Sequence, residues 1–451
     1  MRTLLSVALI AAALPLATPA FAQGPTGGVV TGGSGTIQQN ANTTLINQQT
    51  QRLALDWQQF NVAQNHTVQF VQPNAQAVAL NRIHDQNPSQ IFGAIIANGS
   101  VFLVNPNGII FSETASVNVN SFFATTLDVS PDDFMSGNWD FKQVAGTNGM
   151  IVNRGLIAAA SAGSVTMVAG AVVNEGVILA DYGTVTLAGA TRAYVDFDGD
   201  GLLRFEVSGE LTSNPGADAA VANNGTIQAN GGQVLLTAQA VDAIFASAVN
   251  NGGVITANRI ENVGGIVRLG GGSGTTMVAG TIDVSSQNGV GGTVEVTGDR
   301  VGLMDGATID ASGTAGGGKV NVGGGFQGND PNIQNATVTY VAETATIDAS
   351  ATDNGNGGEV IVWADDTTRF FGTISARGGD NGGDGGFVEV SGKGHLNYSG
   401  LTDTRAPHGA TGTLLLDPTN IFIADDQTNA TAAGMSGTDA TADTSGNPFT
   451  A

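Results

Sequence analysis

Short segments with a regular apolar pattern recur along the chain from about residue 150 onward. One kind of segment is a glycine or alanine, then a second residue, then an isoleucine, at 155–157, 176–178, 225–227, 253–255, 280–282, 307–309, 345–347 and 372–374. The isoleucines recur most often at intervals of 27 residues, with intervals of 49 and 38 where an insertion or an unmarked repeat intervenes. A regular period in this range indicates a structure built from stacked units.

A second kind of segment follows each of these after a glycine-containing turn. Its second position is valine and its fourth is apolar, at 164–167, 184–187, 233–236, 266–269, 293–296, 319–322, 359–362 and 387–390. Such alternation gives a strand one inward and one outward face. Strands that recur once per unit stack in parallel, because each unit buries its apolar face only against its neighbours. The pattern therefore predicts an all-β fold, a right-handed parallel β-helix (solenoid).

Composition divides the chain into further parts. Residues 23–150 contain more glutamine, asparagine and phenylalanine and less glycine punctuation, so we expect an N-terminal β cap that covers the first strand edges. Residues 151–425 are expected to form the β-helix shaft. Residues 426–451 are a polar segment, expected to be loose. Because no C-terminal cap is evident, we expect this chain to be a fragment of a longer protein.

The first 22 residues have the features of a signal peptide. Arg2 precedes an apolar run at 4–16, and Ala20-Phe21-Ala22 offers a small-residue cleavage pattern before Gln23. The run is too short to cross a bilayer, and no later segment reaches that length. We therefore expect the mature chain to leave the cytoplasm and not to be an integral membrane protein.

Charge and cysteine content narrow the range of partners. The formal net charge is −23, from 15 basic and 38 acidic residues, and there are no cysteines. Such a surface repels nucleic acid, so no nucleic-acid partner is expected. Without cysteines, the exported chain relies on core packing and backbone hydrogen bonds, and nothing cross-links it before an export step that needs an unfolded chain.

Six motif blocks follow one another between residues 56 and 111. They lie at 56–62, 68–73, 79–83, 89–93, 97–99 and 101–111, and the last contains Asn105-Pro106-Asn107-Gly108-Ile109. In this order the blocks resemble the N-terminal secretion domain of filamentous-haemagglutinin-like proteins, the exported partners in two-partner secretion. The resemblance covers residues 23 to about 130. A second Asn-Pro-Asn-Leu motif found in some members is absent from this chain.

The resemblance implies a secreted or cell-surface protein of a Gram-negative bacterium that travels through the periplasm. It implies an outer-membrane transporter with periplasmic receptor domains as the partner, which would bind the extended chain by adding it as a strand. The residues expected to carry the secretion motif or transporter recognition are Trp57, Phe60, Asn61, Asn81, Arg82, Asn105, Pro106, Asn107, Gly108 and Ile109. Physically, the Asn-Pro-Asn-Gly segment is a tight turn, in which Asn107 and Gly108 tolerate left-handed backbone angles.

Candidate chemistry is sparse elsewhere. Asp196, Asp198 and Asp200 alternate as in a calcium loop, but the position that should supply the bidentate carboxylate is Val207, so a polar turn is the preferred interpretation. Aspartates follow the repeat isoleucine at 283, 310 and 348, and we expect them at coil corners, accepting backbone N–H groups. We expect no metal site, no catalytic residue and no cofactor.

The functional hypothesis is a non-enzymatic adhesin, haemagglutinin-like, whose host-cell or surface receptor is unknown. A polysaccharide-degrading β-helix enzyme is an alternative, although its carboxylate or calcium cluster is not evident in the sequence. The stalk of a longer toxin-delivery protein is another.

Overall fold

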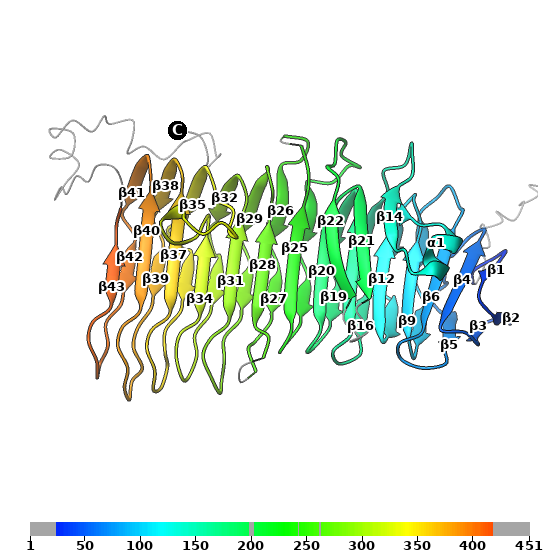
Figure 1. Ribbon diagram of the computed structural model, residues 1–451, viewed down its shortest axis with the longest axis horizontal. Helices are drawn as coiled ribbons and strands as arrows, with labels where there is room; N and C mark the ends of the chain where they lie inside the picture. The colour runs from blue at the N-terminus through cyan, green and yellow to red at the C-terminus, as the bar shows by residue number, and fades with distance from the viewer. Residues whose placement is uncertain (1–23, 198–202, 242, 261–262, 418–451) are drawn as a thin grey trace, which may run out of the picture.

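The computed structural model describes residues 24–197, 203–241, 243–260 and 263–417, without the side chains of 196–207. These residues form a rod of stacked coils, with the N-terminal end blue and the last coils orange in Figure 1. The expected signal peptide, 1–22, and the expected loose tail, 426–451, lie outside the described residues. Among the described residues, no helix is long and apolar enough to cross a membrane.

Three long sheets run the length of the rod. Sheet I consists of β1 (Val29–Gly32), β4 (Arg52–Trp57), β6 (Val78–Ile83), β9 (Ser100–Val104), β12 (Ser121–Thr125), β17 (Ser164–Ala169), β20 (Thr184–Gly189), β25 (Gln233–Ala238), β28 (Ile266–Gly270), β31 (Thr293–Thr297), β34 (Lys319–Val322), β37 (Glu359–Ala364), β40 (Phe387–Gly392) and β43 (Thr413–Leu415).

Sheet II consists of β2 (Gly35–Gln39), β3 (Thr43–Gln48), β5 (Thr67–Val71), β8 (Ala94–Ala97), β11 (Ser116–Val119), β16 (Leu156–Ala159), β19 (Val177–Leu179), β24 (Thr226–Gln228), β27 (Val254–Thr256), β30 (Thr281–Asp283), β33 (Thr308–Asp310), β36 (Thr346–Asp348), β39 (Thr373–Ser375) and β42 (Leu401–Asp403).

Sheet III consists of β7 (Ser89–Ile91), β10 (Ile109–Phe111), β15 (Met150–Asn153), β18 (Ala171–Asn174), β23 (Ala219–Asn223), β26 (Ser247–Asn251), β29 (Thr275–Val278), β32 (Arg300–Leu303), β35 (Val338–Val341), β38 (Thr367–Phe370) and β41 (His395–Tyr398). Each coil of the shaft passes through sheets III, II and I in turn. The strands of successive coils pair in parallel, so the predicted all-β parallel β-helix is confirmed.

The two sequence patterns correspond to two of these sheets. The isoleucine segments form sheet II, where Ile157 pairs with Ile178 and Ile178 with Ile227, all fully buried. The valine segments form sheet I, where Val165 and Val185 pair and are buried. The interval of 49 residues contains a hairpin (192–208), and the interval of 38 contains a loop (323–337) with the short 3-10 helix η1 (Phe326–Gly328).

The coils begin on the N-terminal side of residue 150. Strands β3, β5 and β8 already pair in parallel within sheet II, and β4, β6 and β9 within sheet I. The antiparallel strands of these sheets are β1 and β2, which pair with β4 and β3. The antiparallel cap therefore consists of β1 and β2, and residues 43–125 are built from the same parallel coils as the shaft.

Glycine is required at the corner between sheets III and II. A Cβ atom built on Gly176 would lie 2.3 Å from the carbonyl oxygen of Gly155, and one on Gly225 would lie 2.1 Å from that of Gly176. Real Cβ atoms do not approach a carbonyl oxygen so closely. The repeating glycine thus reflects the close approach of one coil to the next, not a left-handed turn.

A buried asparagine ladder lies beside this corner. Asn153 donates from Nδ2 to Oδ1 of Asn174 at 2.8 Å, Asn174 donates to Asn223 at 2.8 Å, and Asn223 donates to Asn251 at 2.8 Å. All four side chains are fully buried. The first three amides therefore each bind a partner on the next coil, which satisfies polar groups that would be costly to bury alone, and the ladder ends at Asn251, whose Nδ2 has no hydrogen-bond partner among the described residues.

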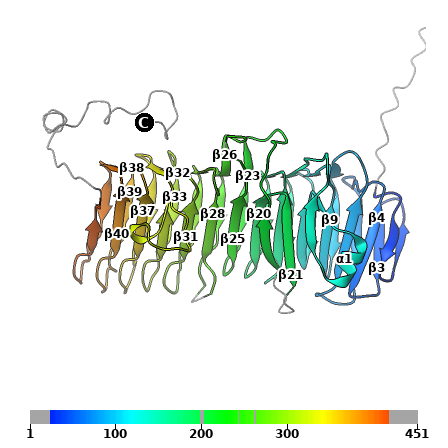
Figure 2. The ribbon, with the colours of Figure 1, turned by 45° about the horizontal axis from the view of Figure 1, so that its top comes forward.

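A second, smaller core lies on the outer face of sheet I. The short helix α1 (Pro131–Ser136) and sheet IV, formed by β13 (Leu127–Asp128), β14 (Asp140–Gln143), β21 (Arg192–Phe197) and β22 (Leu203–Ser208), cover this face near the N-terminal end (Figure 2). Phe102 and Phe123 point outward from sheet I, and their ring centroids lie 4.9 Å apart. Phe134 and Trp139 stack on each other with ring centroids 5.4 Å apart, and their centroids lie 6.0 and 5.3 Å from that of Phe102. The outer face is thereby buried by segments inserted between coils.

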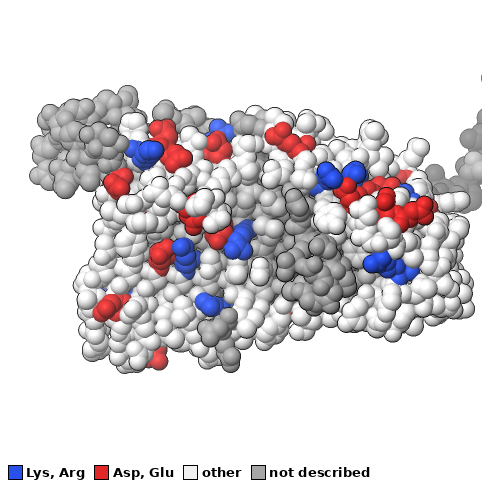
Figure 3. Space-filling model, in the orientation of Figure 1, with Lys and Arg blue, Asp and Glu red and all other residues white. Residues whose placement is uncertain are grey.

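Ion pairs hold sheet IV together at its surface. In Figure 3, acidic and basic side chains lie close together near α1. Asp140 accepts hydrogen bonds from Nε and Nη2 of Arg192 at 2.8 and 2.9 Å, and Lys142 Nζ lies 2.8 Å from its Oδ2. The hydrogen bonds from Arg192 are the main reason that the pKa of Asp140 falls to about 2, from 3.8.

The aspartates that follow the repeat isoleucines lie at corners, as predicted. Oδ1 of Asp283, Asp310 and Asp348 each accepts the backbone N–H two residues later, at 2.9 Å. The three residues are also paired in register on adjacent strands of sheet II. Their carboxylates thus form an acidic row on the C-terminal half of that sheet's outer face.

We predict that Asn174→Ala destabilises the folded chain by about 2–4 kcal/mol, because it leaves Oδ1 of Asn223 buried without a partner and leaves Nδ2 of Asn153 only its longer bond to the carbonyl oxygen of Gly155, at 3.4 Å. Urea denaturation followed by circular dichroism measures the loss. Asn118→Ala, at an exposed position on sheet II, is the matched control and should cost under about 0.5 kcal/mol. Equal losses in the two variants would contradict a stabilising role for the ladder.

We also predict a pH-dependent contribution from Asp140. Because its pKa is lower in the folded chain than in the unfolded one, its stabilisation is present above about pH 4 and is lost as the pH falls toward 2. The free energy of unfolding of the wild type should exceed that of Asp140→Asn by about 1 kcal/mol at pH 5, allowing for solvent screening, and the gap should close near pH 2. A gap that does not change with pH would refute this assignment.

Candidate secretion-motif site

The residues of the predicted secretion motif gather in the first coils of the rod. Trp57 ends β4, and Phe60 and Asn61 follow it in the turn. Asn81 and Arg82 lie on β6, and 105–108 form the turn that leads into β10, which begins at Ile109. The parallel pairing of β4 with β6 and of β6 with β9 brings these segments together.

Trp57 and Asn81 form a buried polar pair in the core. Nε1 of Trp57 donates to Oδ1 of Asn81 at 3.0 Å. Nδ2 of Asn81 donates to the carbonyl oxygens of Ala79 and Phe102, at 3.3 and 3.2 Å. The Trp57 ring also contacts Phe60 edge to face, with centroids 5.4 Å apart. Asn81 points inward because it satisfies the indole N–H, which has no water to bind there.

Asn61 connects two coils through the backbone. Its side chain is almost fully buried, and Oδ1 accepts the N–H of Gln90 on β7 at 2.7 Å. The neighbouring Val62 forms a parallel bridge with Ile91. The Trp-x-x-Phe-Asn block therefore fixes the path of the turn after β4 and the start of sheet III.

The Asn-Pro-Asn-Gly segment is a turn held by its first asparagine. Oδ1 of the fully buried Asn105 accepts the N–H of Asn107 at 3.0 Å, and Nδ2 donates to the carbonyl oxygen of Asn87 at 3.1 Å and to Oγ of Ser89 at 3.0 Å. Gly108 donates its N–H to the carbonyl oxygen of Asn105 at 3.0 Å. The turn is thus attached to the segment before β7.

The backbone angles of the turn correct one expectation. Gly108 has φ +114°, as a tight turn requires, but Asn107 is not among the residues with positive φ. Nδ2 of Asn107 instead donates to the carbonyl oxygen of Asp85 at 2.8 Å. The side chain of Asn107 is therefore used for a contact between turns, and the left-handed conformation falls on the glycine alone.

Arg82 lies at the centre of a charged group on the outer face of sheet I. Its Nε and Nη2 bind the two carboxylate oxygens of Asp128 at 2.9 and 2.8 Å, and Nη1 lies 3.3 Å from Oδ1 of Asp56. His84 Nε2 lies 3.2 Å from the other oxygen of Asp56. The hydrogen bond with Asp128 is the largest of the effects that raise the pKa of Arg82. This group ties β13, at the edge of sheet IV, to β6.

Burial defines what these residues can do in the folded chain. The side chains of Trp57, Phe60, Asn81, Asn105 and Ile109 are at most 1% exposed. A partner cannot reach them once the coils have formed. In the folded state the motif specifies the geometry of the first coils, and direct recognition of these side chains requires an unfolded chain.

Five residues that were not among the expected motif residues complete this arrangement. Asp56 and Asp128 bind Arg82, and Asp85, Asn87 and Ser89 accept the hydrogen bonds of the turn. Asp56 directly precedes the tryptophan of its block, so its position was a usable signal. Asp128 is 46 residues from Arg82, and only the packing of β13 reveals the pair.

The calcium hypothesis falls largely outside the described residues. Asp198 and Asp200 are not described, and of Asp196 only the backbone is, as part of β21. Within the described part of the chain, no three His, Cys, Asp or Glu side chains lie close enough together to hold a metal ion.

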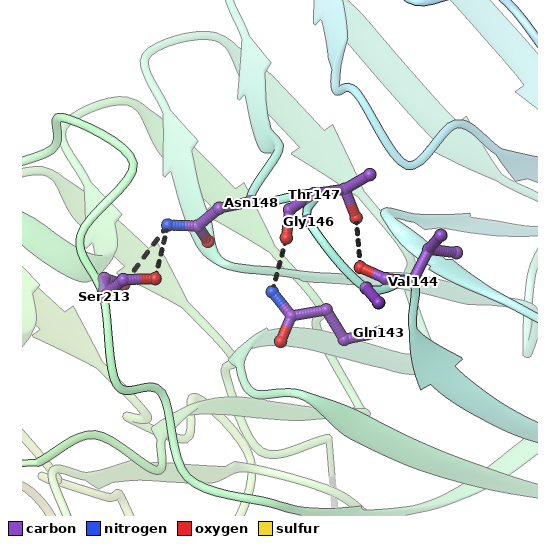
Figure 4. A pocket seen from close by; sticks show the side chains of 7 residues that line it. Gln143, Val144, Gly146, Thr147, Asn148 and Ser213 are labelled. Carbon is purple, nitrogen blue, oxygen red and sulfur yellow. Dashed lines mark hydrogen bonds between the residues drawn. The ribbon is translucent and has the colours of Figure 1, made fainter.

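A recess lies beside sheet IV, and the residues that line it form hydrogen bonds with one another. It is lined by residues 143–148 and Ser213 (Figure 4). Nε2 of Gln143 donates to the carbonyl oxygen of Thr147 at 2.7 Å, and Nδ2 of Asn148 donates to Oγ of Ser213 at 3.0 Å. These two bonds link the lining residues to one another, whereas Oδ1 of Asn148 has no hydrogen-bond partner among the described residues.

We predict that the two asparagines of the turn differ in their contribution to stability. Asn105→Ala removes three hydrogen bonds at a buried site and should cost about 2–3 kcal/mol, whereas Asn107→Ala removes one at a half-buried site and should cost about 1 kcal/mol. Thermal and urea denaturation of the purified variants measure both. A neutral Asn105→Ala would contradict the role of its side chain in the turn.

Comparison with known proteins identifies one matching family model and two curated relatives of similar sequence. The family model of the TPS secretion domain matches residues 22–284. Two heme/hemopexin-binding proteins of Haemophilus influenzae are 43% identical over 105 residues and 40% identical over 110 residues. The aligned segments cover 23% and 24% of this chain but only 12% of each relative.

A solved structure extends the similarity over most of the rod. The crystal structure of the HMW1 secretion domain from Haemophilus influenzae is 32% identical, with a TM-score of 0.75, and the match covers 87% of this chain and all of that one. The predicted resemblance is thereby confirmed at the level of sequence and of fold. This chain belongs to the TPS (two-partner secretion) secretion-domain family, whose members are secreted through the periplasm of Gram-negative bacteria.

Proposed function

We propose that this chain is exported through a partner outer-membrane β-barrel transporter with periplasmic receptor domains, and that its rod then acts as a non-enzymatic adhesin at the cell surface. The observation that carries the export proposal is the burial of the motif side chains in the folded coils. Residues that are inaccessible after folding can be read by a transporter only while the chain is extended.

Strand addition is a suitable mode for this recognition. An extended chain presents unpaired backbone N–H and C=O groups along both edges, which a receptor domain can pair with its own strand edge. The same groups pair with neighbouring coils in the folded rod. Binding to the receptor and coil formation therefore compete for one set of hydrogen bonds, so that the receptor retains the unfolded segment and folding releases it.

Folding outside the cell supplies a direction for transport. Each coil between β16 and β40 buries an isoleucine on sheet II and a valine on sheet I as it forms, and it pairs its strands with the preceding coil. A folded coil does not return through a narrow pore. Stepwise coil formation at the outer surface thus biases movement outward, without an energy source in the periplasm.

The adhesin role follows from the rod and not from a pocket. A long, regular outer surface suits contact with a cell surface over an extended area, as in other solenoids. The named activity of the two curated relatives makes haem and hemopexin the first soluble ligands to test. The alternatives are degradation of a polysaccharide and a stalk function in a longer toxin-delivery protein. Robust turnover of an acidic polysaccharide by the secreted chain would refute the adhesin proposal.

Export can be tested with variants that separate the motif from general stability. We expect the double variant Asn105→Ala/Asn107→Ala to accumulate in the periplasm of cells that express the partner transporter. Immunoblots of periplasm and medium measure the secreted fraction, which should fall at least about tenfold, because the extended chain then lacks two side chains that the receptor domains are proposed to recognise.

Asn174→Ala is the matched control, because it also removes buried hydrogen bonds but lies outside the motif. It should be secreted at close to the wild-type level. Normal secretion of the motif variant would show that the turn has only a structural role in the finished rod. Equal retention of both variants would assign the effect to stability instead of recognition.

A further inference from the structure

A long loop covers the outer face of sheet I near the last coils of the rod. This loop, residues 323–337, is called the strap below; it is yellow in Figure 1, and its tip, η1, lies against β37. The ring of Phe326 meets that of Phe387 edge to face, with centroids 5.7 Å apart. The backbone of Gly328 lies on the indole of Trp363, since a Cβ atom built on it would be 2.7 Å from the ring. The tip of the strap therefore rests on two aromatic side chains.

A buried carboxylate lies beneath the tip of the strap. Glu389 stands on β40 between Val388 and Val390, which point into the core, so its own side chain points outward. It is nevertheless 0% exposed. Oε2 accepts the N–H of Gln327 at 3.0 Å, whereas Oε1 has no hydrogen-bond partner among the described residues. The closed strap thus takes from this carboxylate the water that would solvate its second oxygen, which is costly when the group is ionised.

The tip of the strap is suited to move away from the sheet. Gln327 has φ +51° and ψ 23°, a left-handed conformation that residues with a side chain rarely adopt. Three glycines occupy positions 323–325, and Gly323 has φ +78°, so the backbone turns easily where the strap begins. Phe326 is 46% exposed although it lies at the tip. A segment with a strained residue and few buried contacts can open locally while the coils stay folded.

We propose that the strap is a pH-sensitive lid, which closes over Glu389 when this carboxyl is protonated and opens more often when it is ionised. Opening exchanges one N–H hydrogen bond for water on both carboxylate oxygens, and it uncovers Trp363 and Phe387. The coils beneath remain as they are, because β34, β37 and β40 pair through their own backbones. This lid belongs to the finished rod and is independent of the route of export.

The charged groups around Glu389 are mostly acidic. On the neighbouring β37, Glu359 forms an ion pair with Lys319 of β34 at 2.8 Å. Asp417, which follows β43, adds negative charge near the carboxylate. Among the described residues, Glu389 itself forms no ion pair. The other ionisable side chains of the strap and of the hollow beside Gln327 are Asp330, Asp365 and Lys393.

Burial sets the direction in which the lid responds to pH. Loss of water raises the pKa of the Glu389 carboxyl above its ordinary 4.5, more than the N–H of Gln327 and the hydroxyl of Ser391 lower it, and the carboxylates of Asp417 and Glu359 raise it further. In the open strap the carboxyl is in water and has its ordinary pKa. The closed strap therefore binds the proton more tightly. Closure is fully favoured below about pH 4 and weakens as the pH rises from there through the raised pKa.

Hydrogen exchange of the secreted, purified chain between pH 4 and 8 tests the lid. The N–H of Gln327 is bonded to the carboxylate and exchanges only when the strap opens. Wild type and Glu389→Gln are compared in the same buffers by mass spectrometry, so that the intrinsic pH dependence of exchange cancels. The ratio of their exchange rates in the strap should rise at least about threefold from pH 4 to pH 8, because only the wild type then buries a charge. A ratio that does not change with pH would overturn the proposal.

Two variants with neighbouring carboxylates removed are the matched controls. Glu359→Gln and Asp417→Asn should keep the pH dependence of the wild type, and its loss in either of them would assign the titration to another group. Circular dichroism establishes that each variant is folded. In the wild type alone, exchange corrected for the intrinsic rate should quicken with pH in the strap but not in β37. The same dependence in both segments would refute the lid even if no variant folds.

Discussion

Parallel backbone pairing between successive coils is the interaction on which the whole molecule depends. No coil is stable alone, because its strands find their hydrogen-bonding partners and its isoleucine finds its apolar surroundings only in the neighbouring coils. The spacing between coils, about 4.8 Å, is therefore fixed everywhere. The stacked glycines, the asparagine ladder and the corner aspartates all follow from that spacing.

The pairing of each coil with its neighbours also bears on export. A chain whose hydrogen bonds are all made between neighbours can form from one end, one coil at a time. The motif residues occupy the first coils, where the turn held by Asn105 and the pair of Trp57 with Asn81 set the path that later coils copy. The absence of cysteines and the low density of charge suit the proposed export of an unfolded chain. The proposed adhesin role depends on the exposed outer surface of the finished rod.

The outer faces of the sheets differ along the rod in what covers them and in their charge. Insertions between coils build a second core around Phe102 and Phe123 on sheet I, whereas the outward positions of sheet II are uncharged from β3 to β27 and include a row of aspartates from β30 onward. These differences do not disturb the inward rows, because alternation assigns inward and outward positions to separate residues. Stability and surface function can thus vary almost independently along this fold.

The sequence by itself determined the parallel β-helix, since each repeat places its isoleucine and valine on an inward face at a regular period. It also determined the family, through six ordered blocks. It did not reveal sheet III, whose strands lack a strong common pattern, or the ladder of Asn153 and Asn174, whose members are 21 residues apart. Only the tertiary structure decided which motif side chains are buried, that Arg82 pairs with Asp128, and which outer face is covered. The reason is that these contacts join residues brought together by coil stacking and by inserted segments, and local periodicity carries no information about either.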